Sequence, residues 1–276
     1  PCCRVQQYSH FIVRLCNCSI VDRMIRAENI VKEFNGNLVL KGISAEFYPG
    51  KTNLIIGRSG AGKTVFLKTL VGLNQPTSGK IWYGNTDLFS LDKKALRKIR
   101  MEVGMLFQGS ALFDSLTTEQ NIRFPLDMFT NMTKKEKIDR VNYCLARVNL
   151  ENANNKYPSE LSGGMQKRVG IARAIVLEPK YLFCDEPNSG LDPKTSILID
   201  ELIKSITVEN NITTIINTHD MNSVMEIGDN SVFLHNGLVE WNGNKSQVLD
   251  SDNELLQEFI FASPFLRRLR DAARKL

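Results

Sequence analysis

Residues 57–64 read GRSGAGKT and fit the phosphate-binding pattern GxxxxGK(S/T) at every fixed position. An apolar run, NLIIG, leads into this octapeptide and a helical stretch, VFLKTLVGL, follows it, so the segment joins a strand to a helix. The glycines let backbone N–H groups turn inward around phosphate oxygens, and the dipole of the helix favours negative charge there. Lys63 can reach β and γ oxygens, while Thr64 offers a hydroxyl to Mg²⁺. The sequence therefore predicts that this loop binds the phosphates of a nucleotide.

The composition of the chain is that of an ordinary globular protein. Of its 276 residues, 42% are hydrophobic and 24% are charged, which excludes a collagen-like repeat and a disulfide-stabilised miniprotein. No run of about 18 apolar residues occurs, so no transmembrane helix is expected. The formal net charge of +5 is weak evidence for nucleic acid, which usually requires a clustered basic face. We therefore expect no nucleic-acid partner.

Strand and helix patterns on both sides of the loop predict an α/β fold with a mainly parallel sheet. Upstream, IRAENIVKEF and LVLKGISAEFYPG flank a turn at residues 35–37 and predict an antiparallel β subdomain. Downstream, strand patterns recur at GKIWYG, EVGMLFQ, YLFCDE and ITTIINTH, while residues 113–178 hold mostly helical patterns. Strands that alternate with helices favour parallel pairing.

These patterns divide the chain into three parts, which are residues 1–23, 24–250 and 251–276. The main domain spans residues 24–250 and includes an inserted helical subdomain at about residues 108–179. Residues 251–276 form a predicted C-terminal helical extension, whose last stretch, FLRRLRDAARKL, is basic with leucines at helical spacing. That stretch can lie on anionic lipid or on a neighbouring subunit, or it can be a solvated helix docked by its leucines.

Residues 1–23 show no periodicity, and the first methionine of the chain is Met24. Four of the six cysteines crowd this segment, at Cys2, Cys3, Cys16 and Cys18. Their spacing lacks the paired CxxC arrangement of zinc sites. We interpret the segment as a non-native or disordered leader and exclude it from the fold. The two remaining cysteines fit a reduced, cytosolic chain.

Polar side chains with catalytic potential follow three of the predicted strands. YLFCDE ends in two carboxylates, of which Asp185 is placed to hold Mg²⁺ and Glu186 to orient and deprotonate an attacking water. His219 follows ITTIINT and can hydrogen-bond a γ-phosphate or that water. Gln108 ends EVGMLFQ and can reach the metal or the water. Taken singly, each of these residues is more often a solvated strand end or a structural side chain.

A second anion site is predicted at LSGGM, residues 161–165. Ser162 is placed to cap the following helix, and Gly163 and Gly164 expose backbone N–H groups at its start. One nucleotide does not need both this site and GRSGAGKT within one subunit. The economical interpretation is that LSGGM faces the nucleotide of another copy in a two-fold dimer.

Taken in order, GRSGAGKT, Gln108, LSGGM, YLFCDE, SGLD at residues 189–192 and His219 resemble the motifs of an ABC-transporter ATP-binding subunit, over about residues 25–245. The resemblance implies a RecA-like P-loop NTPase core that uses ATP and Mg²⁺ and works as a sandwich homodimer. It implies ATP binding by Phe34, Gly57, Arg58, Ser59, Gly60, Ala61, Gly62, Lys63 and Thr64. It implies a metal site at Thr64, Gln108 and Asp185, and catalysis by Glu186, His219 and Gln108. Ser162, Gly163, Gly164 and Asp192 would act on the partner's ATP.

Phe34 is similar in position to the family's aromatic residue that stacks on adenine, although a core Phe in a strand is a serious alternative. Asn188 stands in DEPNSGLD at a position that the family usually fills with a small residue or Thr. That departure leaves the catalytic groups intact.

Within the family, the segment GSALFDSLTTEQNIRFPL (residues 109–126) and LSGGMQKRVGIARAI (residues 161–175) resemble the ATPases of Mla-type phospholipid transport systems. This resemblance implies a membrane permease of the MlaE kind, further accessory subunits, and a peripheral location on the cytoplasmic face of the inner membrane. The alternative is an ABC transporter for another substrate, such as an amino acid, an ion or a lipoprotein. A soluble ABC ATPase acting on nucleic acid or ribosomes is less favoured, because the chain lacks heptads and a duplicated cassette.

Overall fold

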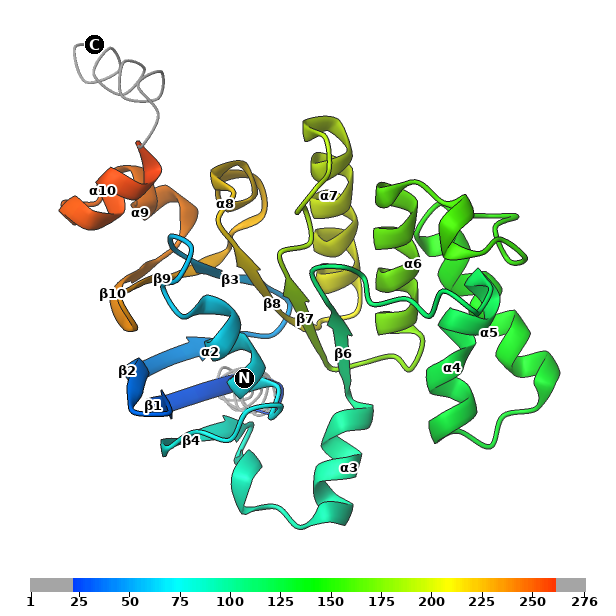
Figure 1. Cartoon of the computed structure of the whole chain (residues 1–276), viewed down its shortest axis with the longest axis horizontal. Helices are drawn as coiled ribbons and strands as arrows, with labels where there is room; N and C mark the ends of the chain where they lie inside the picture. Colours follow the sequence, from blue (N-terminus) through cyan, green and yellow to red (C-terminus); the bar gives the residue numbers. More distant parts are fainter. Residues whose placement is uncertain (1–21, 262–276) are drawn as a thin grey trace, which may run out of the picture.

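The computed structural model describes residues 22–261, which form two β-sheets surrounded by helices (Figure 1). Most of the predicted leader at residues 1–23 lies outside the described residues, and so does the basic stretch at residues 265–276. Between residues 22 and 261, no helix has the length and apolar character needed to cross a membrane.

The larger sheet has six strands and carries the phosphate loop. In spatial order the strands are β10 (Leu238–Gly243), β9 (Asn230–His235), β3 (Thr52–Ile56), β8 (Thr213–Thr218), β7 (Tyr181–Asp185) and β6 (Val103–Leu106). Neighbouring strands are parallel, except that β10 pairs antiparallel with β9. Strands β3, β7 and β8 are buried along their whole length, as expected where both faces of a parallel sheet are covered.

The smaller sheet is antiparallel. Its order is β2 (Asn37–Phe47), β1 (Ile25–Phe34), β4 (Ser78–Tyr83) and β5 (Thr86–Asp87). Asn35 and Gly36 join β1 to β2 with φ angles of 49° and 82°, values that an Asn-Gly pair adopts at little cost. The predicted antiparallel subdomain is therefore confirmed.

The helices fall into groups along the chain. Before β6 lie α2 (Lys63–Leu70), the 3₁₀ turn η1 (Leu88–Ser90) and α3 (Lys93–Met101). Between β6 and β7 lie α4 (Thr118–Phe129), α5 (Lys134–Arg147), the 3₁₀ turn η2 (Pro158–Glu160) and α6 (Gly163–Ile175). After β7 lie α7 (Pro193–Glu209), α8 (Met221–Ile227), α9 (Lys245–Leu249) and α10 (Glu254–Ile260). Helices α4, α5 and α6 pack together at one end of the molecule, so the predicted α/β fold with inserted helices is confirmed (Figure 1).

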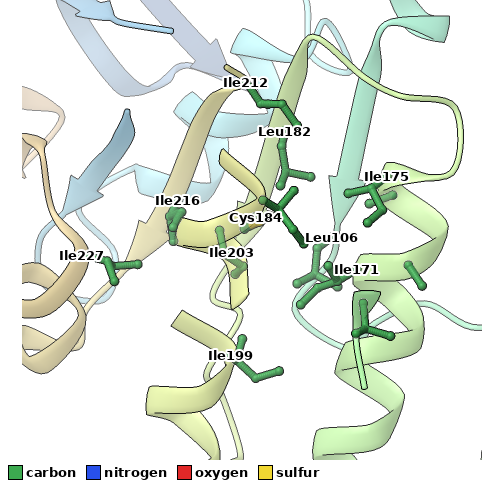
Figure 2. Close-up of a cluster of buried hydrophobic side chains, with 14 of the residues drawn as sticks. Leu106, Ile171, Ile175, Leu182, Cys184, Ile199, Ile203, Ile212, Ile216 and Ile227 are labelled. Carbon is green, nitrogen blue, oxygen red and sulfur yellow. The ribbon is translucent and has the colours of Figure 1, made fainter. Parts of the chain in front are cut away.

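Two hydrophobic cores lie on opposite faces of the larger sheet. On one face, side chains of β6, β7 and β8 such as Leu106 and Leu182 pack against α6 and α7, where Ile171 and Ile199 point toward them (Figure 2). On the other face, Ile55 packs toward the smaller sheet and α2. Successive strand residues point to opposite faces, which is why the neighbours of Ile55 belong to the first core. The cores hold the strands rigidly and leave their carboxyl ends to carry polar groups.

Candidate functional site

The phosphate loop connects β3 to α2, as the sequence predicts. Gly57 has a φ of +150°, and a Cβ atom there would lie 2.3 Å from the carbonyl oxygen of Leu234 on β9. Gly62 is the N-cap of α2 with a φ of +99° and makes no side-chain capping bond. The first N–H groups of a helix have no intrahelical partner. An open helix N-terminus therefore faces the loop, as anion binding requires.

The side chain of Lys63 lies inside the phosphate loop. Its side chain is buried, and Nζ donates to the carbonyl oxygens of Gly57 at 2.9 Å and Arg58 at 3.1 Å. Burial lowers the pKa of Lys63, while the carboxylates of Glu186 and Asp185 act in the opposite direction. The ammonium group is thus held where it can meet phosphate oxygens and is matched by two negative charges.

Thr64 and Asp185 meet at the predicted metal position. Thr64 Oγ1 lies 3.2 Å from Asp185 Oδ1. Asn217, from the neighbouring strand β8, donates from Nδ2 to Asp185 Oδ1 at 2.5 Å and to Thr64 Oγ1 at 3.0 Å. A hydroxyl and a carboxylate are hard oxygen donors that suit Mg²⁺, whose remaining positions are usually filled by water and phosphate oxygens. The residues therefore fit the predicted metal ion.

Glu186 and His219 come together at the ends of β7 and β8. Glu186 has a φ of +47°, and its N–H donates to the carbonyl oxygen of Asn217 at 2.9 Å. Its Oε1 atom lies 3.1 Å from His219 Nδ1. A left-handed backbone at a residue with a side chain costs energy, and such residues gather at functional sites. The two predicted catalytic groups thus form one hydrogen-bonded pair.

Gln108 follows β6 and lies across from this pair. Its Nε2 atom donates to Ser189 Oγ at 3.4 Å, and Lys167 of α6 donates to its backbone carbonyl. Burial lowers the pKa of Lys167, and the thiol of Cys184 heads the groups that oppose this shift. Among the described residues, no hydrogen bond joins Gln108 to Thr64, so the part of Gln108 in metal binding stays a prediction.

A single pocket of about 900 Å³ collects most of the predicted residues. It is lined by Val39, Arg58, Ser59, Gly60, Gly62, Lys63, Thr64, Val65, Gln108, Glu186, His219 and Phe259. Phe259 comes from α10, and its ring centroid lies 5.4 Å from that of Phe233. Phe34, by contrast, is 42% exposed and stacks under Lys32 Nζ at 4.7 Å from its ring centroid. Its contact with adenine stays a prediction.

The second predicted anion site is built from other elements. Ser162 caps α6, with Oγ accepting from the N–H of Met165 at 3.3 Å. Asp192 caps α7 and accepts from the N–H of Thr195 at 3.0 Å. Gly164 lies so close to α7 that a Cβ atom would come within 2.6 Å of Thr195 Cγ2. Within the described part of the chain, the lining of the 900 Å³ pocket includes none of Ser162, Gly163, Gly164 and Asp192.

Sequence reasoning missed three residues of this region. Asn217 lies in a strand that reads as a plain apolar run with a polar end, although it is the register partner of Asp185. Lys167 belongs to the helix after LSGGM, and nothing in its local pattern indicates a bond to Gln108. Phe259 lies far along the chain from the phosphate loop. Strand pairing brings Asn217 to the site, and the packing of α6 and α10 brings Lys167 and Phe259.

Comparisons with known proteins identify a family and individual relatives to which this chain is similar. The sequence model of the family described as "ABC transporter" matches residues 40–189. The "Probable ribonucleotide transport ATP-binding protein mkl" of Mycobacterium leprae is 36% identical over 236 residues, which cover 86% of this chain and 68% of that protein. The "Methionine import ATP-binding protein MetN 1" of Oceanobacillus iheyensis is 39% identical over 242 residues, covering 86% of this chain and 71% of that protein. The chain thus spans about two thirds of the length of these relatives.

A solved structure shares the fold. It is the dimeric, post-hydrolysis state of the ATP-binding cassette MJ0796, described as a bacterial ABC transporter cassette, bound to ADP and Pi. The TM-score is 0.73 and the identity 32%, over 80% of this chain and 98% of that chain.

Proposed function

This chain belongs to the ABC transporter family, and from that premise we propose that two copies enclose two ATP molecules between them. Each ATP would be held by the phosphate loop of one copy and by residues 162–164 of the other. Family membership makes the chain the ATP-binding subunit of a transporter and an ATPase that uses Mg²⁺. One observation carries the proposal. The predicted phosphate-loop residues line the 900 Å³ pocket, whereas residues 162–164 lie at the start of α6 and are not part of that lining.

The pocket residues support a division of labour in hydrolysis. Lys63 would bind the β and γ oxygens, and Thr64 and Asp185 would hold the metal ion, with Asn217 fixing both. When bound, Mg²⁺ neutralises charge between the phosphate groups. Glu186 would orient the attacking water and take its proton on a carboxylate oxygen. His219 would hold that carboxylate in place through the 3.1 Å contact with Oε1.

A mixing experiment tests whether the site is shared between two copies. Ser162→Arg places a bulky cation at the exposed start of α6, and Lys63→Ala removes the phosphate contact. Each variant alone should form inactive dimers. In a mixed dimer, the intact phosphate loop of one copy meets the intact residues 162–164 of the other, so an equal mixture should recover about a quarter of the wild-type ATPase activity.

Recovery is not expected if each chain completes its own site, because every chain in the mixture then carries a damaged one. Nucleotide binding by the Ser162→Arg variant serves as the control for folding. It should remain, since its phosphate loop is unchanged. An inactive mixture of two variants that both fold would contradict the shared site.

An apolar surface on the inserted helices fits a membrane partner. Phe113 and Phe124 are 44% and 40% exposed, and their ring centroids lie 5.0 Å apart. The buried amide of Asn121 fixes the preceding loop, because Nδ2 donates to the carbonyl oxygens of Phe113 and Leu116 at 3.1 and 3.0 Å, and Oδ1 accepts from the N–H of Phe113 at 2.8 Å. Exposed aromatic residues on a rigid loop are typical of protein interfaces. We infer that the permease binds here and receives the motion of the dimer.

Replacement of both Phe113 and Phe124 by Ala should therefore release the permease without harming hydrolysis. The purified variant should keep the basal ATPase activity of the wild type, because neither ring touches the nucleotide pocket. Purification from detergent-solubilised membranes should recover the wild-type subunit with a permease and the variant without it. The matched control is Tyr143→Ala, which removes a 54% exposed ring from α5. Permease retained by the double variant would contradict this interface.

Two lines of support, which differ in strength, favour different transported substrates. The names of the two relatives concern ribonucleotide transport and methionine import, which favours a transporter for a substrate other than phospholipid. The phospholipid reading, with an MlaE-like permease and accessory subunits at the inner membrane, rests on the resemblance of residues 109–126 and 161–175 alone. Mass spectrometry of the proteins and lipids that purify with the subunit separates them. A permease of the MlaE kind with bound phospholipid would support the second reading, and a different permease would support the first.

A further inference from the structure

A buried polar cluster lies behind the Glu186 loop and has no part in the function described so far. It consists of Asn188 in that loop, Asp200 on α7 and Ser223 on α8. Asn188 Nδ2 donates to Asp200 Oδ1 at 2.9 Å and to Ser223 Oγ at 3.0 Å. The Ser223 hydroxyl and the Asn188 amide both act to lower the pKa of the Asp200 carboxyl. Asp200 is 4% exposed and Ser223 is 1% exposed, while Asn188 is half-buried.

The cluster joins the two segments that carry the catalytic pair. Asn188 lies two residues after Glu186, and α8 begins two residues after His219, with Asp220 as its N-cap. The Asn188 amide binds Asp200 and Ser223 at once, and through Asp200 it connects both segments to α7. Any change in the spacing of these segments alters the 3.1 Å contact between Glu186 Oε1 and His219 Nδ1. The helix that begins at Asp192 is thereby connected to the catalytic pair.

We propose that Asp200 is a positioning residue for ATP hydrolysis, which holds the Glu186 loop and α8 at the spacing that lets Glu186 meet His219. This inference rests on the proposed role of Glu186 as the base. It also explains the unusual Asn188. An Asn amide carries two protons and can bind Asp200 and Ser223 at once, whereas a Thr hydroxyl at this position donates only one.

The charged form of the Asp200 carboxyl is disfavoured at this buried position. Burial raises the pKa of Asp200 to about 6, hydrogen bonds from Ser223 and Asn188 act in the opposite direction, and Asp220 and Glu226 add to the rise. The groove that Asp200 helps to line also contains the charged or titratable side chains of Glu186, Glu201, Lys204 and His219. On β7, the charge of Asp200 contributes to a raised pKa of the Cys184 thiol. Because the folded-state pKa lies above the unfolded value, the contribution of Asp200 to stability is present at low pH and is lost as pH rises through about 6. A group that opposes folding at neutral pH suggests a demand other than stability.

The test is a double-mutant cycle on the full chain. Asp200→Ala and Asn188→Ala should each lower kcat about tenfold, since both release the Glu186 loop, while the Kd for ATP stays within about twofold of the wild type. The double variant should be no slower than either single variant, because the same link is broken only once. Asp200→Asn retains an acceptor oxygen for Asn188 and should restore most of kcat.

Glu201→Ala is the matched control, since it removes an exposed carboxylate from the next position of α7 and should leave kcat unchanged. Thermal unfolding of every variant identifies any variant that fails to fold. Such a variant is replaced by the milder Ser223→Ala, which removes one hydroxyl. Wild-type kcat in Asp200→Ala overturns the proposal, and so do losses that multiply in the double variant. Loss of turnover in Glu186→Gln without any effect of Asp200→Ala would reject this inference alone, whereas full turnover in Glu186→Gln would reject the proposed role of Glu186 as the base.

Discussion

The Glu186→Gln variant is expected to bind ATP normally and to hydrolyse it about 10²- to 10⁴-fold more slowly than the wild type. Gln is close in size and shape to Glu and can still accept a hydrogen bond from His219, so the pair at the ends of β7 and β8 should keep its geometry. The amide cannot take a proton from water. ATP should therefore accumulate unhydrolysed between two copies and hold the dimer closed.

Two measurements check this result. Steady-state phosphate release gives the loss of kcat, and size-exclusion chromatography with ATP and Mg²⁺ detects the trapped dimer. The control is Glu151→Gln, which makes the same chemical change at an exposed position before α6 and should alter neither quantity. Turnover near the wild-type value in Glu186→Gln would show that another group activates the water.

A different failure is expected for Lys63→Ala. This variant should lose about 10²- to 10³-fold in kcat/KM, because a preorganised charge is removed from developing negative charge on the phosphates. The wild-type ammonium is held by the carbonyl oxygens of Gly57 and Arg58, so it needs no rearrangement to act. Unlike Glu186→Gln, this change should weaken nucleotide binding as well as the chemical step.

Titration with a fluorescent ATP analogue separates the two effects in Lys63→Ala. Lys68→Ala, at a half-buried position in the last turn of α2, is the matched control and should bind the analogue like the wild type. If Lys63→Ala retains both affinity and turnover, the phosphate loop is not the nucleotide site and the assignment of the whole pocket falls.

Local sequence was sufficient to predict the elements of this fold and most of the pocket. The strand, glycine loop and helix at residues 52–70 are contiguous, and their roles follow from residue type and spacing. The carboxylates after β7 and the histidine after β8 are also adjacent to their strands. What could not be predicted depends on contacts between distant segments. Asn217 reaches Asp185 only because β7 and β8 are neighbours in register.

The C-terminal elements illustrate the same limit. Phe259 lines the 900 Å³ pocket, and its ring packs against Phe233, a contact that no periodicity in either segment indicates. The cluster of Asn188, Asp200 and Ser223 is likewise invisible in the sequence. In the sequence each of the three is an ordinary polar residue, and only the packing of the loop after β7, α7 and α8 brings them together.

The place of β3 in the larger sheet has a consequence for synthesis of the protein. β3 is made early, yet both of its neighbours are made late, since Thr52 pairs with Thr214 and Asn53 with Asn230. The loop that follows it is supported by the turn after β9, where the N–H of Gly237 donates to the carbonyl oxygen of Ala61 at 3.2 Å. A ribosome releases the chain from its N-terminus. The nascent chain therefore carries the complete GRSGAGKT motif long before the strands that support it exist, and we expect it to gain affinity for ATP only after β8, β9 and the turn that follows β9 have been made.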